Sequence, residues 1–151
     1  MKVFKSIRIF LLLGINIKLL FLEAFFLLGW ARILKSMPFS KIAPSLGEHM
    51  NETSLIIDES KKQQLKNISE AVNIMSRNTF WESMCLVKAI AAMKMLERRQ
   101  IESTIYLGTA KDETGKLIAH AWLRSGPFYI TGAEVMDQFV VVSKFAKKIS
   151  S

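Results

Sequence analysis

The stretch CLVKAIAAMKMLERRQIESTIYLGTAKDETGKLIAHAWLR occupies residues 85–124, and the spacing of its apolar residues changes once. Along Cys85–Arg99 they recur every three or four residues, which is typical of a helix. Ser103–Thr109 is rich in β-branched and aromatic residues, and Leu117–Arg124 alternates between two faces, so both are predicted to be strands. Asp112–Gly115 supplies a turn between them.

Two more helices are predicted upstream of this stretch. The apolar segment 9–35 has to end before Met37-Pro38, because the residue before a proline avoids the helical region. In segment 58–75 the apolar residues again follow helical spacing, at Leu65, Ile68, Val72 and Met75.

Short strands are predicted downstream, at Phe128–Thr131 and Phe139–Val142, with a turn at Ser125-Gly126-Pro127. Helices followed by an antiparallel meander define an α+β fold. We expect an N-terminal helical region over residues 1–60 and a core domain over residues 61–151.

The composition narrows the classes of function. The 151 residues contain 21 Lys and Arg against 13 Asp and Glu, a net charge of +8, and residues 1–22 contain cations but no acid. Such a surplus suits nucleic acid, an anionic membrane surface or an acidic partner. No stripe of cations interleaved with stacking aromatics is present in the globular part, so nucleic acid is not expected.

A single cysteine excludes an intrachain disulfide and indicates a reducing, cytoplasmic setting. With only His49 and His120 beside it, no ordinary Cys/His metal site can be assembled, and glycine-rich nucleotide motifs are missing. We therefore expect neither metal nor cofactor.

The apolar N-terminal segment resembles both a signal peptide and a membrane span. Lys18, Glu23 and Arg32 interrupt it, and no small-residue cleavage site follows its longest uncharged piece. We interpret it as a helix packed largely against protein, with contact to a membrane surface as the alternative. If Glu23 is buried, it needs a basic partner.

Cys85 and His120 are the candidate catalytic residues. Ser83 is a suitable N-cap, which would make Cys85 the second helical residue, where free N–H groups and the positive helix end favour thiolate over thiol. His120 lies on a predicted strand, on a face onto which that helix could pack. Each residue alone is more often a packing residue, but together they supply a nucleophile and a base.

Several separated motifs resemble one family, the leader peptidases of lasso-peptide biosynthesis. These form the protease half of the microcin-processing B proteins, a branch of the transglutaminase-like cysteine peptidases. The matching residues are Trp81-x-x-x-Cys85-Leu86, Ala89-Ile90-Ala91-Ala92, Tyr106-Leu107-Gly108, Ala119-His120-Ala121-Trp122-Leu123-Arg124 and Phe139-Val140-Val141-Val142.

The resemblance implies an activity and partners. A ribosomally made precursor peptide would be cut between leader and core, with Cys85 as nucleophile and His120 as base and then acid. The product would pass to an ATP-dependent macrolactam synthetase. Fused family members carry a leader-recognition domain, for which this chain has no room, so a separate leader-recognition protein is expected. The backbone N–H of Cys85 would donate a hydrogen bond to the oxyanion, and Trp81 and Asn78 are the candidates for a second donor.

The resemblance also implies an aspartate that orients the imidazole. If Ser125-Gly126 is a two-residue turn, His120 faces Thr131, and a three-residue turn makes it face Gly132. Neither is a carboxylate, so the role falls to Thr131, a backbone carbonyl, Glu134 or Asp137. Asp137 is our choice.

Two alternatives to the peptidase remain open. One is a catalytically silent module that binds the leader or the synthetase. The other is a basic membrane-surface protein that uses residues 1–34 as an amphipathic anchor.

Overall fold

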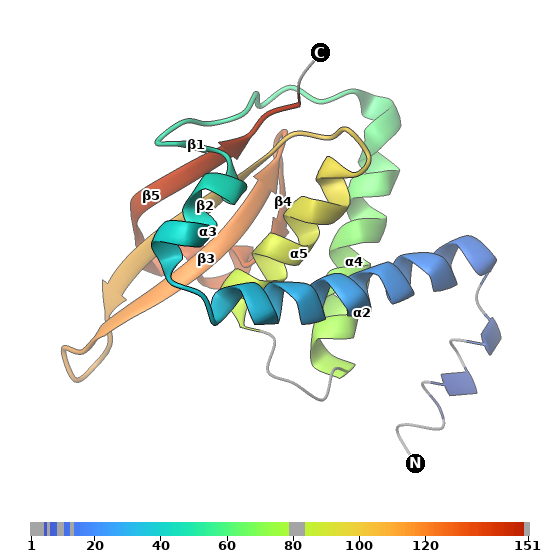
Figure 1. Cartoon of the computed structure of the whole chain (residues 1–151), viewed down its shortest axis with the longest axis horizontal. Helices are drawn as coiled ribbons and strands as arrows, with labels where there is room; N and C mark the ends of the chain where they lie inside the picture. Colours follow the sequence, from blue (N-terminus) through green and yellow to red (C-terminus); the bar gives the residue numbers. More distant parts are fainter. Residues whose placement is uncertain (1–4, 6, 9–10, 13, 79–83, 150–151) are drawn as a thin grey trace.

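Helices cover one face of a five-stranded sheet in the computed structural model of the chain (Figure 1). The structure describes residues 5, 7–8, 11–12, 14–78 and 84–149. Its elements confirm the α+β class. In chain order they are α2 (Ile15–Lys35), α3 (Phe39–Leu46), β1 (Glu48–His49), η1 (Glu59–Lys61), α4 (Lys62–Asn78), α5 (Cys85–Glu97), β2 (Ser103–Lys111), β3 (Leu117–Ser125), β4 (Phe128–Thr131), η2 (Ala133–Gln138) and β5 (Val140–Lys147).

The sheet is antiparallel with the order β1-β5-β2-β3-β4, which corrects the expected meander. A meander would place β5 beside β4, but β5 pairs with β2 instead. The reason lies in the connection. After β4, η2 packs against β3, and the ring of Phe139 lies 5.1 Å from that of His120, so the chain crosses the sheet before β5 begins.

The residues predicted to share each face of β3 do so, but burial does not alternate along the strand, because residues 121–125 are all buried. Leu123 belongs to the hydrophobic core together with Ile105 and residues of α5, whereas Trp122 stacks on Tyr106 outside that core. Because strand side chains alternate, His120 shares the face of Trp122. The expectation that the cysteine helix packs on the histidine's face is therefore wrong. α5 needs apolar surface, and Leu123 and Ile105 provide it on the other face.

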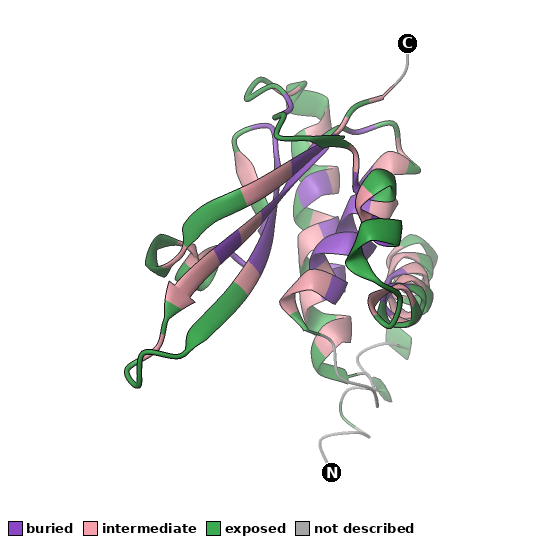
Figure 2. Cartoon of the chain, turned by 60° about the vertical axis from the view of Figure 1, so that its left-hand side comes forward, coloured by how far each residue is buried: buried purple, intermediate pink, exposed green. Residues whose placement is uncertain are grey.

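Helix α5 is buried on nearly every side. Val87, Ala91 and Met95 are buried in addition to the predicted apolar face. The helix lies between the sheet and α2, with α4 beside it, and Figure 2 shows buried residues lining these facing surfaces. The sequence predicted a one-sided helix, but a central helix has neighbours all round and needs apolar residues all round.

The N-terminal helices contribute to the same core. Leu28 of α2 and Leu46 of α3 belong to the core cluster that contains Leu65 and Ile90. Helix α2 ends at Lys35, before Pro38, as predicted. Among the described residues, no helix is long and apolar enough to cross a membrane.

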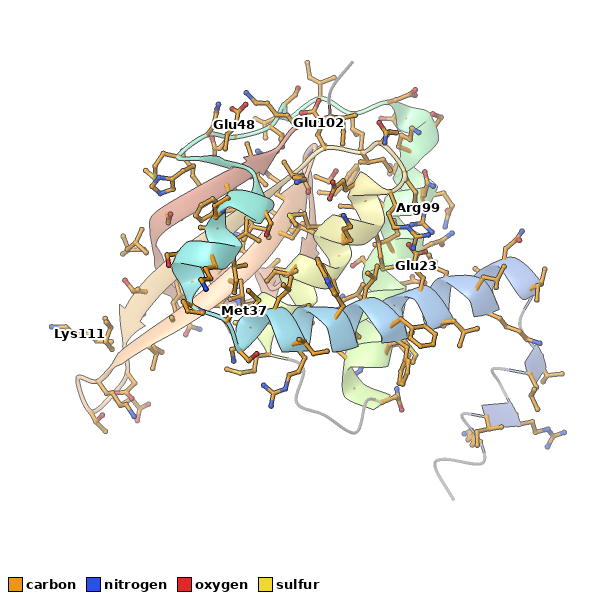
Figure 3. All side chains as sticks on the ribbon, in the orientation of Figure 1. Glu23, Met37, Glu48, Arg99, Glu102 and Lys111 are labelled. Atoms are coloured by element: carbon orange, nitrogen blue, oxygen red, sulfur yellow. The ribbon has the colours of Figure 1, made fainter. Side chains whose placement is uncertain are left out.

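Glu23 has the basic partners that its burial requires, as predicted. Its carboxylate accepts hydrogen bonds of 2.6 and 2.9 Å from the two terminal nitrogens of Arg99, and one of 2.9 Å from Arg98. Only 13% of the Glu23 side chain is exposed. Figure 3 shows Glu23 and Arg99 close together between α2 and the end of α5. The fork-shaped pairing ties α2 to the helix that begins with Cys85.

We predict that Glu23→Gln lowers the free energy of unfolding by about 1–3 kcal/mol, because it leaves Arg99 partly buried without its charge partner. Urea unfolding of both proteins measures the change. Glu70→Gln is the matched control, since Glu70 is exposed on α4 and has no ion pair among the described residues. Equal midpoints for all three proteins would contradict the role given to the pair.

Candidate active site

Cys85 is the first residue of α5. Met84 is the N-cap, with φ −73° and ψ 166°, and its side chain makes no capping hydrogen bond. This corrects the expectation that Cys85 is the second helical residue, and the expected cap, Ser83, lies outside the described residues. The backbone N–H of Cys85 is in the first turn and so has no acceptor within the helix. The residue is half-buried.

His120 is held in a stack of rings. Its ring centroid lies 5.8 Å from that of Trp122 and 5.1 Å from that of Phe139. Trp122 in turn stacks on Tyr106 at 5.7 Å. Gly108, the cross-strand neighbour of His120, makes this stack possible, since a Cβ there would lie 2.9 Å from both the Trp122 ring and Phe139 Cβ.

One nitrogen of the imidazole is engaged. Nε2 of His120 lies 2.7 Å from the carbonyl oxygen of Gly132. A carbonyl can only accept, so Nε2 carries a proton and donates it. In the neutral ring Nδ1 then has the free lone pair, and it is the nitrogen that can take a proton from a thiol.

The hairpin register differs from both predicted alternatives. The turn is Gly126-Pro127, Ser125 pairs with Phe128, and a register shift follows before Leu123 pairs with Thr131. Strand β4 ends there, so His120 pairs with neither Thr131 nor Gly132. Gly132 still reaches the ring with its carbonyl because its φ of +77° turns the chain back over β3.

No hydrogen bond or ion pair joins the candidate orienting side chains to His120 within the described part of the chain. Thr131 Oγ1 is buried without a hydrogen-bond partner there. Glu134 and Asp137 are exposed on η2, and within the same ranges neither makes a hydrogen bond or ion pair. The carbonyl of Gly132 is thus the group that orients the imidazole here, and the role of Asp137 stays a prediction.

Cys85 and His120 are not joined by a hydrogen bond in the residues described. Their elements α5 and β3 pack together, but His120 lies on the opposite face of β3 from α5. Any meeting of thiol and imidazole has to occur around the edge of β3 beyond Leu123, where β4 has ended. The dyad therefore stays a prediction as well.

The remaining predicted positions lie apart from this region. His49 is exposed on β1, and its Nε2 lies 2.9 Å from Ser143 Oγ at the other edge of the sheet. The amide of Asn78 donates to the Ile74 carbonyl, and Trp81 lies outside the described residues. Residues 5, 7–8, 11–12, 14–78 and 84–149 contain no cluster of three His, Cys, Asp or Glu that could hold a metal ion.

A partly buried polar network beside the ring stack was not predicted. Arg124 is 3% exposed and donates to Tyr106 Oη at 2.9 Å, while Tyr106 donates to Glu52 at 2.7 Å. Arg124 also donates to the carbonyls of Thr53 and Gly126 at 2.9 and 2.6 Å. The alternation of β3 placed Arg124 on the face of His120, but nothing in the loop sequence indicated that Glu52 and Thr53 cover it.

The network affects the ionisation of two of its members. The hydrogen bond from Tyr106 holds the pKa of Glu52 below its ordinary 4.5. Burial raises the pKa of the Tyr106 phenol. The network ties the segment around Glu52 to the strand that carries His120.

The family comparison agrees with this architecture. A helix that begins with a cysteine and packs on an antiparallel sheet bearing a histidine is the arrangement expected of transglutaminase-like cysteine enzymes. The model of the transglutaminase-like superfamily matches residues 25–144, so the chain belongs to that superfamily. The superfamily typically includes cysteine peptidases and transferases. No curated protein and no solved structure matches the chain.

We predict that Tyr106→Phe destabilises the protein more at neutral than at acid pH. A carboxyl whose pKa is lowered by folding stabilises the native state above its unfolded pKa, and this contribution disappears as the pH falls through the lower native pKa. The stability difference between wild type and Tyr106→Phe should therefore be largest above pH 4.5 and shrink below it. Denaturant titrations across that range measure it, and a pH-independent difference would contradict the Glu52 assignment.

We predict that Gly132→Ala disturbs both stability and the His120 ring. A Cβ at Gly132 would lie 2.5 Å from the Ala121 carbonyl oxygen, and φ is +77°. The expected loss is about 3 kcal/mol, from backbone strain plus steric overlap. Gly115→Ala is the matched control, because Gly115 also has positive φ, +84°, but open space around it. It should cost only about 1 kcal/mol.

The histidine itself gives a second measurement. Nitrogen-15 NMR should show the Nε2–H tautomer for neutral His120 in the wild type and in Gly115→Ala, with a mixture of tautomers in Gly132→Ala. His49 serves as an internal reference. An unchanged His120 tautomer in Gly132→Ala would mean that the carbonyl does not orient the ring.

Proposed function

We propose that this protein is a cysteine peptidase that removes the leader from a lasso-peptide precursor. The observation that carries the proposal is the state of His120, whose Nε2 donates to the Gly132 carbonyl while Nδ1 has no hydrogen-bond partner among the described residues. The superfamily match and the position of Cys85 as the first residue of α5 support it. The particular substrate follows from the sequence motifs that resemble the lasso-peptide leader peptidases.

The chemistry follows from these groups. Nδ1 of His120 takes the proton of the Cys85 thiol, and the thiolate adds to the carbonyl carbon at the junction of leader and core. The N–H of Cys85 donates to the oxyanion. The imidazolium protonates the leaving amine of the core, which leaves the leader as a thioester on Cys85. Water then hydrolyses the thioester and releases the leader carboxylate.

Thiol and imidazole meet at the edge of β3 in this mechanism. Beyond the Leu123–Thr131 pair that edge has no strand partner among the residues described. The free core amine is the group that a macrolactam synthetase would consume. Delivery of the precursor falls to a separate leader-recognition protein.

A second candidate function is a catalytically silent module that binds the leader or the synthetase. The observation in its favour is that no hydrogen bond joins Cys85 and His120 in the described residues, and that α5 and the His120 side chain lie on opposite faces of β3. This candidate predicts that the precursor is bound but never cut.

The two candidates are separated by mass spectrometry of the precursor incubated with the protein and its leader-recognition partner. We expect wild type to cut at one junction, and Cys85→Ala and His120→Ala to lose at least about a thousandfold in rate. His49→Ala is the matched control, because it removes the chain's other histidine at the far edge of the sheet. Cleavage by Cys85→Ala at the wild-type rate would show that Cys85 is not the nucleophile.

Two additions sharpen the experiment. Iodoacetamide can modify only one cysteine in this chain, so intact mass shows whether a single adduct accompanies the loss of cleavage. Asp137→Asn decides the third group. Loss of cleavage assigns the orienting role to that carboxylate, whereas retained cleavage assigns it to the Gly132 carbonyl.

A further inference from the structure

The outward face of α2 is apolar along its whole length. Six large apolar residues on this helix are exposed, and we call them the α2 stripe: Ile15, Leu19, Leu22, Phe26, Trp30 and Ile33. Phe26 and Ile33 are 68% and 69% exposed. A surface helix of a globular domain ordinarily presents polar residues on this face.

The stripe is narrow and continuous. Residues of an α-helix advance by about 100°, so the six members fall within an arc of about 80°. The buried residues Ala24, Leu28 and Ala31 lie on the opposite side of the helix, against α4 and α5. From Ile15 to Ile33 the stripe is about 27 Å long at the rise of an α-helix. Exposed apolar patches of this extent mark interaction surfaces.

The part of the sequence that contains the stripe is rich in positive charge. Residues 1–47 contain seven Lys and Arg and one acid, Glu23, so six of the chain's eight net positive charges belong to this part. Glu23 is neutralised by Arg98 and Arg99. Lys18 and Arg32 occupy the same helix, on one flank of the stripe. A surface that combines an apolar stripe with a cationic flank complements the headgroup region of an anionic bilayer.

We infer that the α2 stripe binds the surface of a membrane that contains anionic phospholipids, with α2 lying in the plane of the interface. The helix cannot stand across the bilayer, because its other face is packed on α4 and α5. Figure 1 shows α2 as the outermost helix, lying across those two. The aromatic members Phe26 and Trp30 suit the boundary between headgroups and acyl chains. This inference does not depend on the peptidase activity.

Vesicle flotation tests the inference with the full-length protein. We expect it to float with vesicles of phosphatidylcholine and phosphatidylglycerol, and less with phosphatidylcholine alone. Raising the salt concentration from about 0.1 M to about 1 M should weaken binding, because it shortens the screening length from about 10 Å to about 3 Å.

Phe26→Asp places a charge in the middle of the stripe and should lower the bound fraction about tenfold or more. Ile56→Asp is the matched control, since Ile56 is 87% exposed in a loop away from α2 and should leave binding unchanged. Circular dichroism and thermal melting confirm that both variants are folded. Tryptophan quenching by bromine-labelled lipid, present in wild type and reduced in Trp30→Phe, locates the contact on the stripe.

Three results would overturn the inference. If wild type does not float, the α2 stripe does not bind these membranes. Equal flotation of wild type and Phe26→Asp places any contact elsewhere. The third result would be that the stripe is a protein interface. Light scattering would then show a dimer for wild type and a monomer for Phe26→Asp, or Phe26→Asp would lose binding to the leader-recognition protein and keep its flotation.

Discussion

The burial of α5 between two layers is the constraint on which the rest of the structure depends. The helix meets α2 and α4 on one side and the sheet on the other, so its alanines and branched residues have to fill space in every direction. This fixes where Cys85 is, since the thiol is carried by the first residue of a helix that cannot shift without opening the core. The Glu23–Arg99 pair adds a polar clamp at the opposite end of the same helix. Cys85, the proposed nucleophile, is thereby positioned by packing, whatever group acts on it.

The histidine is positioned by a different device, the chain crossover after β4. Gly132 turns the chain at positive φ, η2 packs against β3, and Phe139 covers the ring of His120. The crossover supplies both the carbonyl that takes the Nε2 proton and the ring that limits rotation of the imidazole. A main-chain acceptor of this kind is set by the fold itself, so a carboxylate is not the only way to hold the tautomer. The buried Arg124 and Tyr106 extend the support along the same face.

Much of this could be predicted from the sequence, and the exceptions have physical reasons. Strand β4 was predicted at its observed bounds, and the faces of β3 correctly, because local alternation is enough for both. The partner of β5 was missed, and a backbone carbonyl was only one of the alternatives for the acceptor of His120, because each depends on where the chain returns after Gly132. The spacing of apolar residues in α5 predicted one buried face. The burial of Val87 and Met95 could not be predicted, because it depends on the layers that pack on both sides of the helix. Cys85 was placed one residue too far into its helix, because serine is a preferred N-cap residue and Ser83 was therefore chosen as the cap instead of Met84.

The two faces of α2 make different demands on one segment. The inner face has small residues such as Ala24 and Ala31, which let the helix lie close to α5, and the single acid is neutralised by Arg98 and Arg99. The outer face could have been polar at no cost to that packing, because Phe26 and Ile33 contribute little to the core. Folding therefore does not explain why the outer face is apolar, and aqueous exposure of six large apolar side chains favours aggregation. A surface that is costly in water and unnecessary for the fold is explained by what it binds. The positive charge of this part of the chain indicates that the binding partner is an anionic surface.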